Sequence, residues 1–145
     1  MSRGITAAAP AARGFTLVEA MIVMAIIAIL AAIAYPSYTR QVISSHRSAA
    51  QQELLALAAL QEKIYLNSNA YATSMTGAYT GKSTGGLGRT SGRTADDRYT
   101  LSVVVTGGQS FTLTTTPVAG SSQAGSDHLT INSSGARTWG STTRS

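Results

Sequence analysis

The chain has no cysteine, only two histidines, and charged side chains at just 12% of its positions. Without cysteine it can form no disulfide bond, no thiolate metal site and no cysteine nucleophile. The two histidines, His46 and His128, lie far apart in the sequence and make no metal-binding pattern. We therefore expect no cofactor and no metal, and a fold stabilised by packing and hydrogen bonds.

Recognisable catalytic motifs are also missing from the sequence. Ser126, Asp127 and His128 are consecutive, so their side chains point in different directions and do not line up as nucleophile, base and orienting acid. The glycines between positions 85 and 88 follow no strand pattern and open no helix, which is not the context of a phosphate-binding loop. The sequence predicts that the protein is not an enzyme.

Length and charge set two limits. With 145 residues, 14 of them glycine, the chain has room for one small globular unit. The formal net charge is +5, and Arg3 and Arg13 precede the apolar run, so removing residues 1–14 would leave about +3. That remaining charge is a weak argument for an anionic partner.

One long apolar run dominates the amino-terminal third. Fourteen residues from Met21 to Ala34 are apolar without a break. Counting from Phe15 to Tyr35 gives 21 residues, about 30 Å as a helix, which matches the hydrocarbon core of a bilayer. Glu19 is the anomaly, because a carboxylate costs about 2.5 to 3.5 kcal/mol at the centre of a spanning helix. Such a side chain is expected near a helix end, paired, or functional.

A secretory signal peptide is the alternative interpretation of this region. Arg3 and Arg13 would form its positive end, and Ala32-Ile33-Ala34 its cleavage site. The carboxylate within the segment and the helical pattern that continues past Ala34 both disfavour that interpretation.

The residues from Arg13 to Glu19, RGFTLVE, resemble the prepilin cleavage motif of type IV pilins: a glycine before an amino-terminal phenylalanine, with glutamate at the fifth mature position. Pro36 falls at the twenty-second mature position, where that family commonly has proline. The resemblance is strong from Gly14 to about Leu66. A weaker similarity to PilE-like minor pilins extends from Tyr99 to Trp139.

The resemblance implies how the protein is processed and assembled. A prepilin peptidase would cut between Gly14 and Phe15 and methylate the new amino terminus. The subunit would span the inner membrane once, meet an inner-membrane assembly platform, and join other pilin subunits in an extracellular pilus. Glu19 would then pair with the Phe15 amino terminus of a neighbouring subunit and set the register of assembly.

The resemblance and the pattern together predict an α+β pilin fold. A long helix over about 15–67 would carry apolar side chains at three- and four-residue spacing in its distal half, at Ala50, Leu54, Leu57, Leu60 and Ile64. Pro36 removes a backbone donor within that helix, so we expect a kink or local melting there.

Strand patterns begin at Tyr99. Alternation over 99–106 and 110–116, separated by Gly107-Gly108, predicts a hairpin, and LTIN and ARTW predict a second strand pair. The distal half of the helix would therefore pack on an antiparallel sheet of three or four strands.

These elements suggest a division of the chain. Residues 1–14 are the expected leader, 15–38 the membrane and filament-core half of the helix, and 39–145 the periplasmic or extracellular head. Within the head we expect a connecting loop over about 68–98 and a sheet over about 99–140.

The connecting loop is locally basic, with Lys82, Arg89, Arg93 and Arg98 as candidate contacts for DNA or another anion. Tyr71, Tyr79 and Tyr99 place aromatic rings among them, which suits stacking on nucleic acid. A solvated loop whose charges keep it soluble explains the same composition and is the favoured interpretation.

One departure from the relatives concerns the carboxy-terminal region, which they usually close with a disulfide near His128. Since this chain has no cysteine, we expect another closure, such as Trp139 packing onto the sheet. Asn132-Ser133-Ser134 matches a short glycosylation acceptor pattern.

These observations favour a type IV pilus subunit, specifically a minor pilin that supports pilus biogenesis, adhesion and twitching motility. The alternatives are a major pilin, a filament-borne DNA-binding pilin for natural competence, a type II secretion pseudopilin, and a secreted soluble domain. A major pilin and a pseudopilin share the same N-terminal motif, and only the similarity of the C-terminal region favours a minor pilin.

Overall fold

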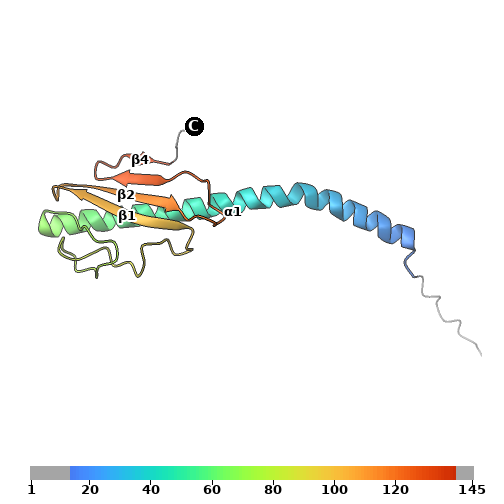
Figure 1. The fold of residues 1–145 in the computed structure, drawn as a ribbon, viewed down its shortest axis with the longest axis horizontal. Helices are drawn as coiled ribbons and strands as arrows, with labels where there is room; N and C mark the ends of the chain where they lie inside the picture. The colour runs from blue at the N-terminus through green and yellow to red at the C-terminus, as the bar shows by residue number, and fades with distance from the viewer. Residues whose placement is uncertain (1–13, 140–145) are drawn as a thin grey trace, which may run out of the picture. The chain divides into compact units, whose positions relative to one another are not determined.

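The computed structural model describes residues 14–139, and the chain divides into two compact units after Thr39. The predicted leader lies outside the described residues except for Gly14. We call 14–39 the amino-terminal unit and 40–139 the head unit. Helix α1 begins in the amino-terminal unit and ends in the head unit, and all the strands belong to the head unit (Figure 1). The bounds of these elements are α1 Leu17–Ser68, β1 Tyr99–Thr106, β2 Ser110–Pro117, β3 Leu129–Asn132 and β4 Arg137–Thr138.

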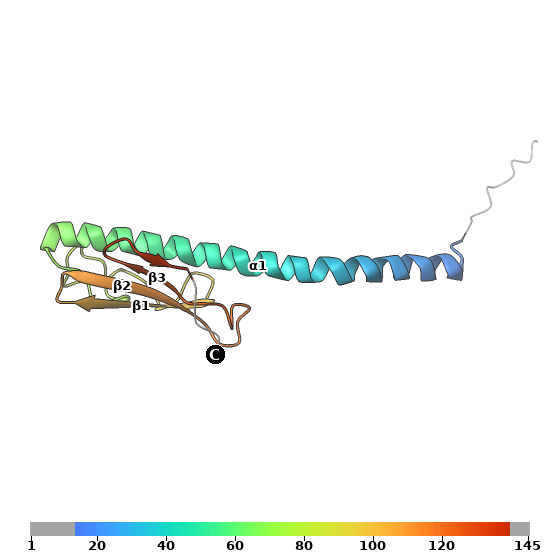
Figure 2. The same ribbon diagram turned by 90° about the horizontal axis from the view of Figure 1, so that it is seen from above.

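The strands form one antiparallel sheet in the order β1-β2-β3-β4. Gly107 and Gly108, with φ of 59° and 72°, make the turn between β1 and β2, a left-handed conformation that glycine adopts without steric cost. This turn and the end of α1 lie at the same end of the head unit (Figure 2), where the Tyr71 amide donates to the Gly108 carbonyl at 3.0 Å. The predicted α+β fold is confirmed.

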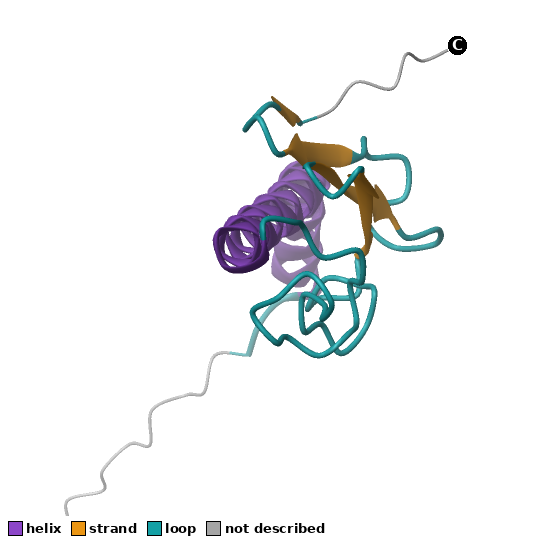
Figure 3. Cartoon of the chain, turned by 90° about the vertical axis from the view of Figure 1, so that its left-hand side faces the viewer, coloured by secondary structure: helices purple, strands orange, loops and turns teal. Residues whose placement is uncertain are grey.

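The core of the head unit lies between α1 and the inner face of the sheet. Seen along the helix in Figure 3, the strands lie to one side of α1 and loops fill the space beside them. Alternation along β1 and β2 is as predicted, with one set of side chains turned inward and the side chains between them turned outward; Thr115 belongs to the inward set. The fully buried apolar residues from these elements are Ala50, Leu54, Leu57, Ile64, Tyr99, Leu101, Phe111, Leu113, Leu129 and Ile131.

The segment between α1 and β1 is more ordered than its composition suggests. It contributes Tyr71, Ala72, Met75 and Leu87 to the core. Two parts of this loop meet at an isolated parallel β-bridge between Ser74 and Gly86. There the Leu87 amide donates a hydrogen bond to the Ser74 carbonyl at 3.0 Å. The loop is therefore part of the folded head, because it covers apolar surface that the four strands leave open.

Gln61 is a buried polar residue that the apolar pattern of α1 does not reveal. Its side chain is fully buried and pairs twice with the backbone of Ala72, donating to the carbonyl at 2.8 Å and accepting from the amide at 2.9 Å. Both polar atoms of the amide are thus satisfied inside the protein. Gln61 fastens the start of the loop to the helix.

The carboxy-terminal closure uses Trp139, as expected in place of a disulfide. Its ring is partly buried against the core, and its carbonyl accepts a hydrogen bond from the Arg47 guanidinium on α1. Packing and one side-chain hydrogen bond therefore hold the end of the described chain to the helix.

Candidate functional site

The amino-terminal unit begins with a capped helix. The hydroxyl of Thr16 accepts a hydrogen bond from the Glu19 amide at 3.2 Å, and the Thr16 carbonyl accepts from Ala20 at 3.2 Å. Threonine at the cap with glutamate three residues on is the pattern of a capping box. The structure therefore gives Glu19 a local position, in the first turn of α1, where a carboxylate also complements the positive helix end.

The surface of this unit is apolar almost throughout. Its large apolar side chains are exposed by about half or more, from Phe15 at 83% to Val23 at 46%. Helix α1 is long and apolar enough to cross a membrane, and none of the apolar window is buried within the protein. Since burial of each such side chain stabilises by roughly 1.5 to 3 kcal/mol, this surface favours an apolar environment outside the protein itself.

Helical structure continues through Pro36 without a break. Local melting is therefore not observed, and a kink stays a prediction. Because proline lacks an N–H, the Ala32 carbonyl loses its usual partner four residues on. One turn later the Thr39 hydroxyl donates to the Tyr35 carbonyl at 2.7 Å, a local bond that often accompanies bending of a helix.

In the head unit, the predicted basic loop residues do not form one free cationic surface. Arg89 pairs with Glu53 of α1, and the other Glu53 oxygen accepts a hydrogen bond from the Ala95 amide at 2.9 Å. The Arg89 guanidinium also donates to the Arg93 carbonyl at 3.2 Å. Arg89 is thus a tie that holds the loop to the helix. Sequence reasoning missed Glu53 because its partner lies 36 residues away.

Arg93 is more available than Arg89. It lies 3.7 Å from Asp97, and both side chains are half or more exposed, so the pair contributes little stability. Arg93 also borders a polar cavity of about 310 Å³ that residues between Gly88 and Asp97 line. Lys82 is exposed on the same loop, some distance along the chain, and Arg98 is half-buried.

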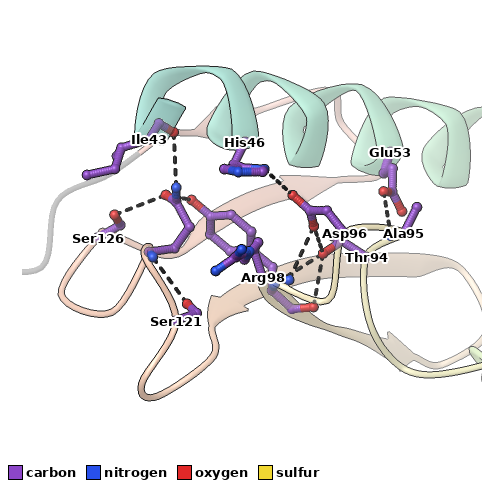
Figure 4. A network of polar contacts seen from close by, with 11 residues as sticks. Ile43, His46, Glu53, Thr94, Ala95, Asp96, Arg98, Ser121 and Ser126 are labelled. Atoms are coloured by element: carbon purple, nitrogen blue, oxygen red, sulfur yellow. Dashed lines mark hydrogen bonds and ion pairs between the residues drawn. The ribbon is translucent and has the colours of Figure 1, made fainter. Parts of the chain in front are cut away.

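A polar network fixes the end of this loop against α1 (Figure 4). His46 contacts Asp96 at 2.7 Å between Nδ1 and Oδ2, and the other Asp96 oxygen accepts from the Thr94 hydroxyl and the Arg98 amide. Burial raises the pKa of Asp96, but these hydrogen bonds and the neighbouring imidazole outweigh it, so the pKa is lowered overall. Asp96 therefore favours its charged form in the folded protein.

A second network joins α1 to the segment before β3 (Figure 4). The buried Gln123 accepts a hydrogen bond from the Tyr99 hydroxyl at 2.8 Å and donates to the Ile43 carbonyl at 3.2 Å. Burial is the main cause that raises the pKa of Tyr99. The Ser126 hydroxyl also contacts Gln123, at 3.3 Å, which gives it a structural role in this network.

No metal site emerges from residues 14–139. The described part of the chain holds no cluster of three or more histidine or acidic side chains able to bind a metal ion. What it holds is an apolar amino-terminal unit whose one carboxylate is Glu19, and a head unit that fixes a partly basic loop.

Comparison with known proteins gives two family matches. Residues 36–130 match the family described as type IV minor pilin ComP, DNA uptake sequence receptor. Residues 10–35 match the prokaryotic N-terminal methylation motif. The first match covers most of the head unit, including the loop, β1, β2 and the first two residues of β3.

Among curated proteins, the type IV major pilin protein PilA of Myxococcus xanthus (strain DK1622) is 44% identical over 63 residues. That stretch is 43% of this chain and 29% of the relative. The chain therefore matches less than a third of that relative's length.

Proposed function

The chain belongs to the type IV minor pilin ComP family, and from that premise we propose that it is made as a prepilin, cut between Gly14 and Phe15, and assembled into a pilus. In this proposal a prepilin peptidase methylates Phe15 and the inner-membrane assembly platform receives the processed subunit. The subunit crosses the inner membrane once before assembly. Adhesion and twitching motility are typical of pilins and are proposed roles of the assembled filament.

The observation that carries this proposal is the exposed apolar surface of the amino-terminal unit with its single charged side chain, Glu19. A bilayer first, and then a bundle of like helices, would bury that surface at little cost in polar desolvation. In the bundle Glu19 would need a cation, and the Phe15 amino terminus of a neighbouring subunit would supply it. The matched family is a pilus family, which favours this assignment over a type II secretion pseudopilin.

Mass spectrometry of the amino-terminal peptide from membrane-extracted protein tests the processing step. We expect a methylated Phe15 as the first residue. A mature chain that starts at Tyr35 would instead establish the signal-peptide alternative and remove the basis for pilus assembly.

DNA binding is the second candidate function, favoured by the family match over residues 36–130. Of the four cations predicted from sequence, Arg93 and Lys82 are the better candidates for phosphate contact, because they are exposed. Arg89 would act through the position of the loop, and Arg98 remains a proposed contact of lesser exposure.

A salt titration of DNA binding separates these roles. Arg93→Gln should lower affinity and reduce the slope of log K against log salt by about 0.9 for duplex DNA, because one phosphate contact is lost. Arg89→Gln should lower the thermal stability of the head, since it leaves Glu53 without its partner. Wild-type protein that binds no DNA at low salt would overturn the second function and leave the first intact.

A further inference from the structure

The last turn of α1 presents an unusual exposed surface. Lys63, Leu66 and Asn67 are three and four residues apart, so they share one face of the helix. All three are exposed, and Leu66 at 84% is the most exposed large apolar side chain of the head unit among the described residues. A leucine in this position adds nothing to the core of the subunit.

The loop after α1 brings two more exposed side chains to the same surface. The Asn67 amide donates to the Gly81 carbonyl at 3.2 Å, and the Ser68 hydroxyl accepts from the Ser83 amide at 3.0 Å. These bonds hold Lys82, which lies between Gly81 and Ser83, against the end of the helix.

Tyr79 lies beside the same exposed surface at the end of α1. A methyl group at Gly81 would lie 3.7 Å from the Asn67 amide nitrogen and 4.0 Å from the Tyr79 hydroxyl, so both side chains flank that glycine. Tyr79 is 40% exposed. We call Lys63, Leu66, Asn67, Tyr79 and Lys82 the terminal patch.

The two ammonium groups of the terminal patch are uncompensated within the described chain. Neither Lys63 nor Lys82 has an ion pair there, in contrast to Arg89, which Glu53 neutralises. Glu62, the acidic neighbour of Lys63 in sequence, accepts a hydrogen bond from the Tyr71 hydroxyl at 3.1 Å. The charge of the terminal patch is therefore available to an anionic partner.

We propose that the terminal patch binds a single-stranded stretch of DNA, an inference that rests on the proposed DNA-binding function. Lys63 and Lys82 contact successive phosphates, while Tyr79 and Leu66 offer flat and apolar surface for the bases. In a duplex the bases stack on one another and only phosphates are accessible to such a patch. A lysine near the carboxyl end of a helix is common, because its charge complements the negative end of the helix dipole. That explanation accounts for Lys63 but not for the exposed Tyr79 and Leu66.

Fluorescence anisotropy of purified full-length protein in a nonionic detergent tests the proposal. The probes are a labelled single-stranded oligonucleotide and a blunt duplex of the same sequence. The double variant Lys63→Gln/Lys82→Gln is compared with Arg40→Gln/Arg137→Gln, which removes the same charge at exposed positions outside the patch. The patch variant should reduce the single-strand salt slope by about 1.4, two contacts at about 0.7 each, and the matched variant should leave it unchanged.

Tyrosine 79 provides the test of stacking. Tyr79→Ala should weaken single-strand binding about 10-fold, whereas Tyr79→Phe keeps the ring and should bind as the wild type does. Neither change should alter binding of the blunt duplex, because its bases are not accessible.

The outcomes separate the patch from the function it rests on. Equal losses on single strand and duplex in Tyr79→Ala, or no effect of that change on either, would overturn the single-strand assignment. DNA binding by the wild type that none of the patch variants alters would overturn the patch and leave the DNA-binding function standing. Absence of all DNA binding by the wild type would overturn both.

Discussion

Two carboxylates, those of Glu53 and Asp96, hold separate segments of the head unit together by hydrogen bonds. Glu53 joins the Arg89 guanidinium and the Ala95 amide to α1, and Asp96 joins His46 to the Thr94 hydroxyl. Each accepts hydrogen bonds from groups that lie far apart in the chain. Charged acceptors make stronger hydrogen bonds than neutral ones, so two residues are enough to hold the basic loop against the helix.

The lowered pKa of Asp96 predicts a pH dependence of stability. A carboxyl whose pKa is lower folded than unfolded stabilises the fold fully above its ordinary pKa near 3.8, and that stabilisation is lost as the pH falls through the folded value. Thermal unfolding at pH 7 and pH 3 should therefore differ less for Asp96→Asn than for the wild type. Asp97→Asn, at an exposed neighbouring position, is the control, and an unchanged pH dependence in Asp96→Asn would contradict the assignment.

Thr115 predicts a stabilising substitution. Its hydroxyl is buried with no hydrogen-bond partner in the described chain, and it lies in register between the buried Leu101 and Leu129. Thr115→Val removes an unsatisfied polar atom and keeps the branched shape, so the free energy of unfolding should rise by about 1 kcal/mol. Denaturant titration measures it. Thr112→Val, on the exposed face of the same strand, should change little; a loss of stability in Thr115→Val would mean that the hydroxyl is satisfied.

At the scale of elements, the fold of the loop between α1 and β1 depends on close contact between two of its backbone segments, 77–78 and 86–88, rather than on helices or strands. A methyl group at Gly86 would lie 2.4 Å from the Gly77 carbonyl oxygen, closer than real side chains approach. The close contact lets the Gly86 amide donate to the Ala78 carbonyl at 2.9 Å and the Gly88 amide to Gly77 at 2.9 Å. Glycine is required there because two backbone segments touch.

Gly86→Ala should therefore open this contact and destabilise the head by about 1 to 3 kcal/mol, the usual cost of forcing extra atoms into a packed site. Gly92→Ala is the matched control, since its added methyl group would meet only the Leu101 carbonyl at an ordinary 3.7 Å. Hydrogen exchange of the amides at 86–89 would report the loss directly. Equal protection in both variants would show that the contact tolerates a side chain.

The whole molecule combines two units with opposite requirements. The head unit buries its apolar residues internally, whereas the amino-terminal unit exposes nearly all of its own. Only an external apolar partner resolves that difference, and in the proposed function the partner is first the membrane and then other subunits. The local capping position of Glu19 raises a further question, namely whether its charge or only its hydrogen bonding is needed.

Substitutions of Glu19 distinguish those two roles in assembly. Glu19→Val should remain in the membrane fraction and fail to enter sheared pili, because the amino terminus of the neighbouring subunit loses its partner. Glu19→Gln can still cap the helix but carries no charge, so it should fail as well. Immunoblots of pili and membranes measure both. Normal incorporation of Glu19→Gln would show that capping suffices and that no ion pair forms.

Much of the fold could be predicted from the sequence, because it depends on periodicity. The spacing of Leu54, Leu57 and Ile64 is a property of neighbours on one helix, and the alternation from Tyr99 onward is a property of neighbours on one strand. Gln61 broke the apolar pattern, and its burial could not be predicted because the Ala72 backbone that satisfies it arrives from a loop.

The amino-acid sequence by itself determined the elements of this protein, the membrane-length apolar run and the cleavage motif, because each is encoded over a short stretch of chain. Tertiary structure alone decided which charges remain available. Arg89 and Lys82 look alike in the sequence, yet the fold pairs the first with Glu53 and gives the second no ion pair within the described chain. The physical reason is that an ion pair depends on distance in space, and residues 36 positions apart meet only after the chain has packed.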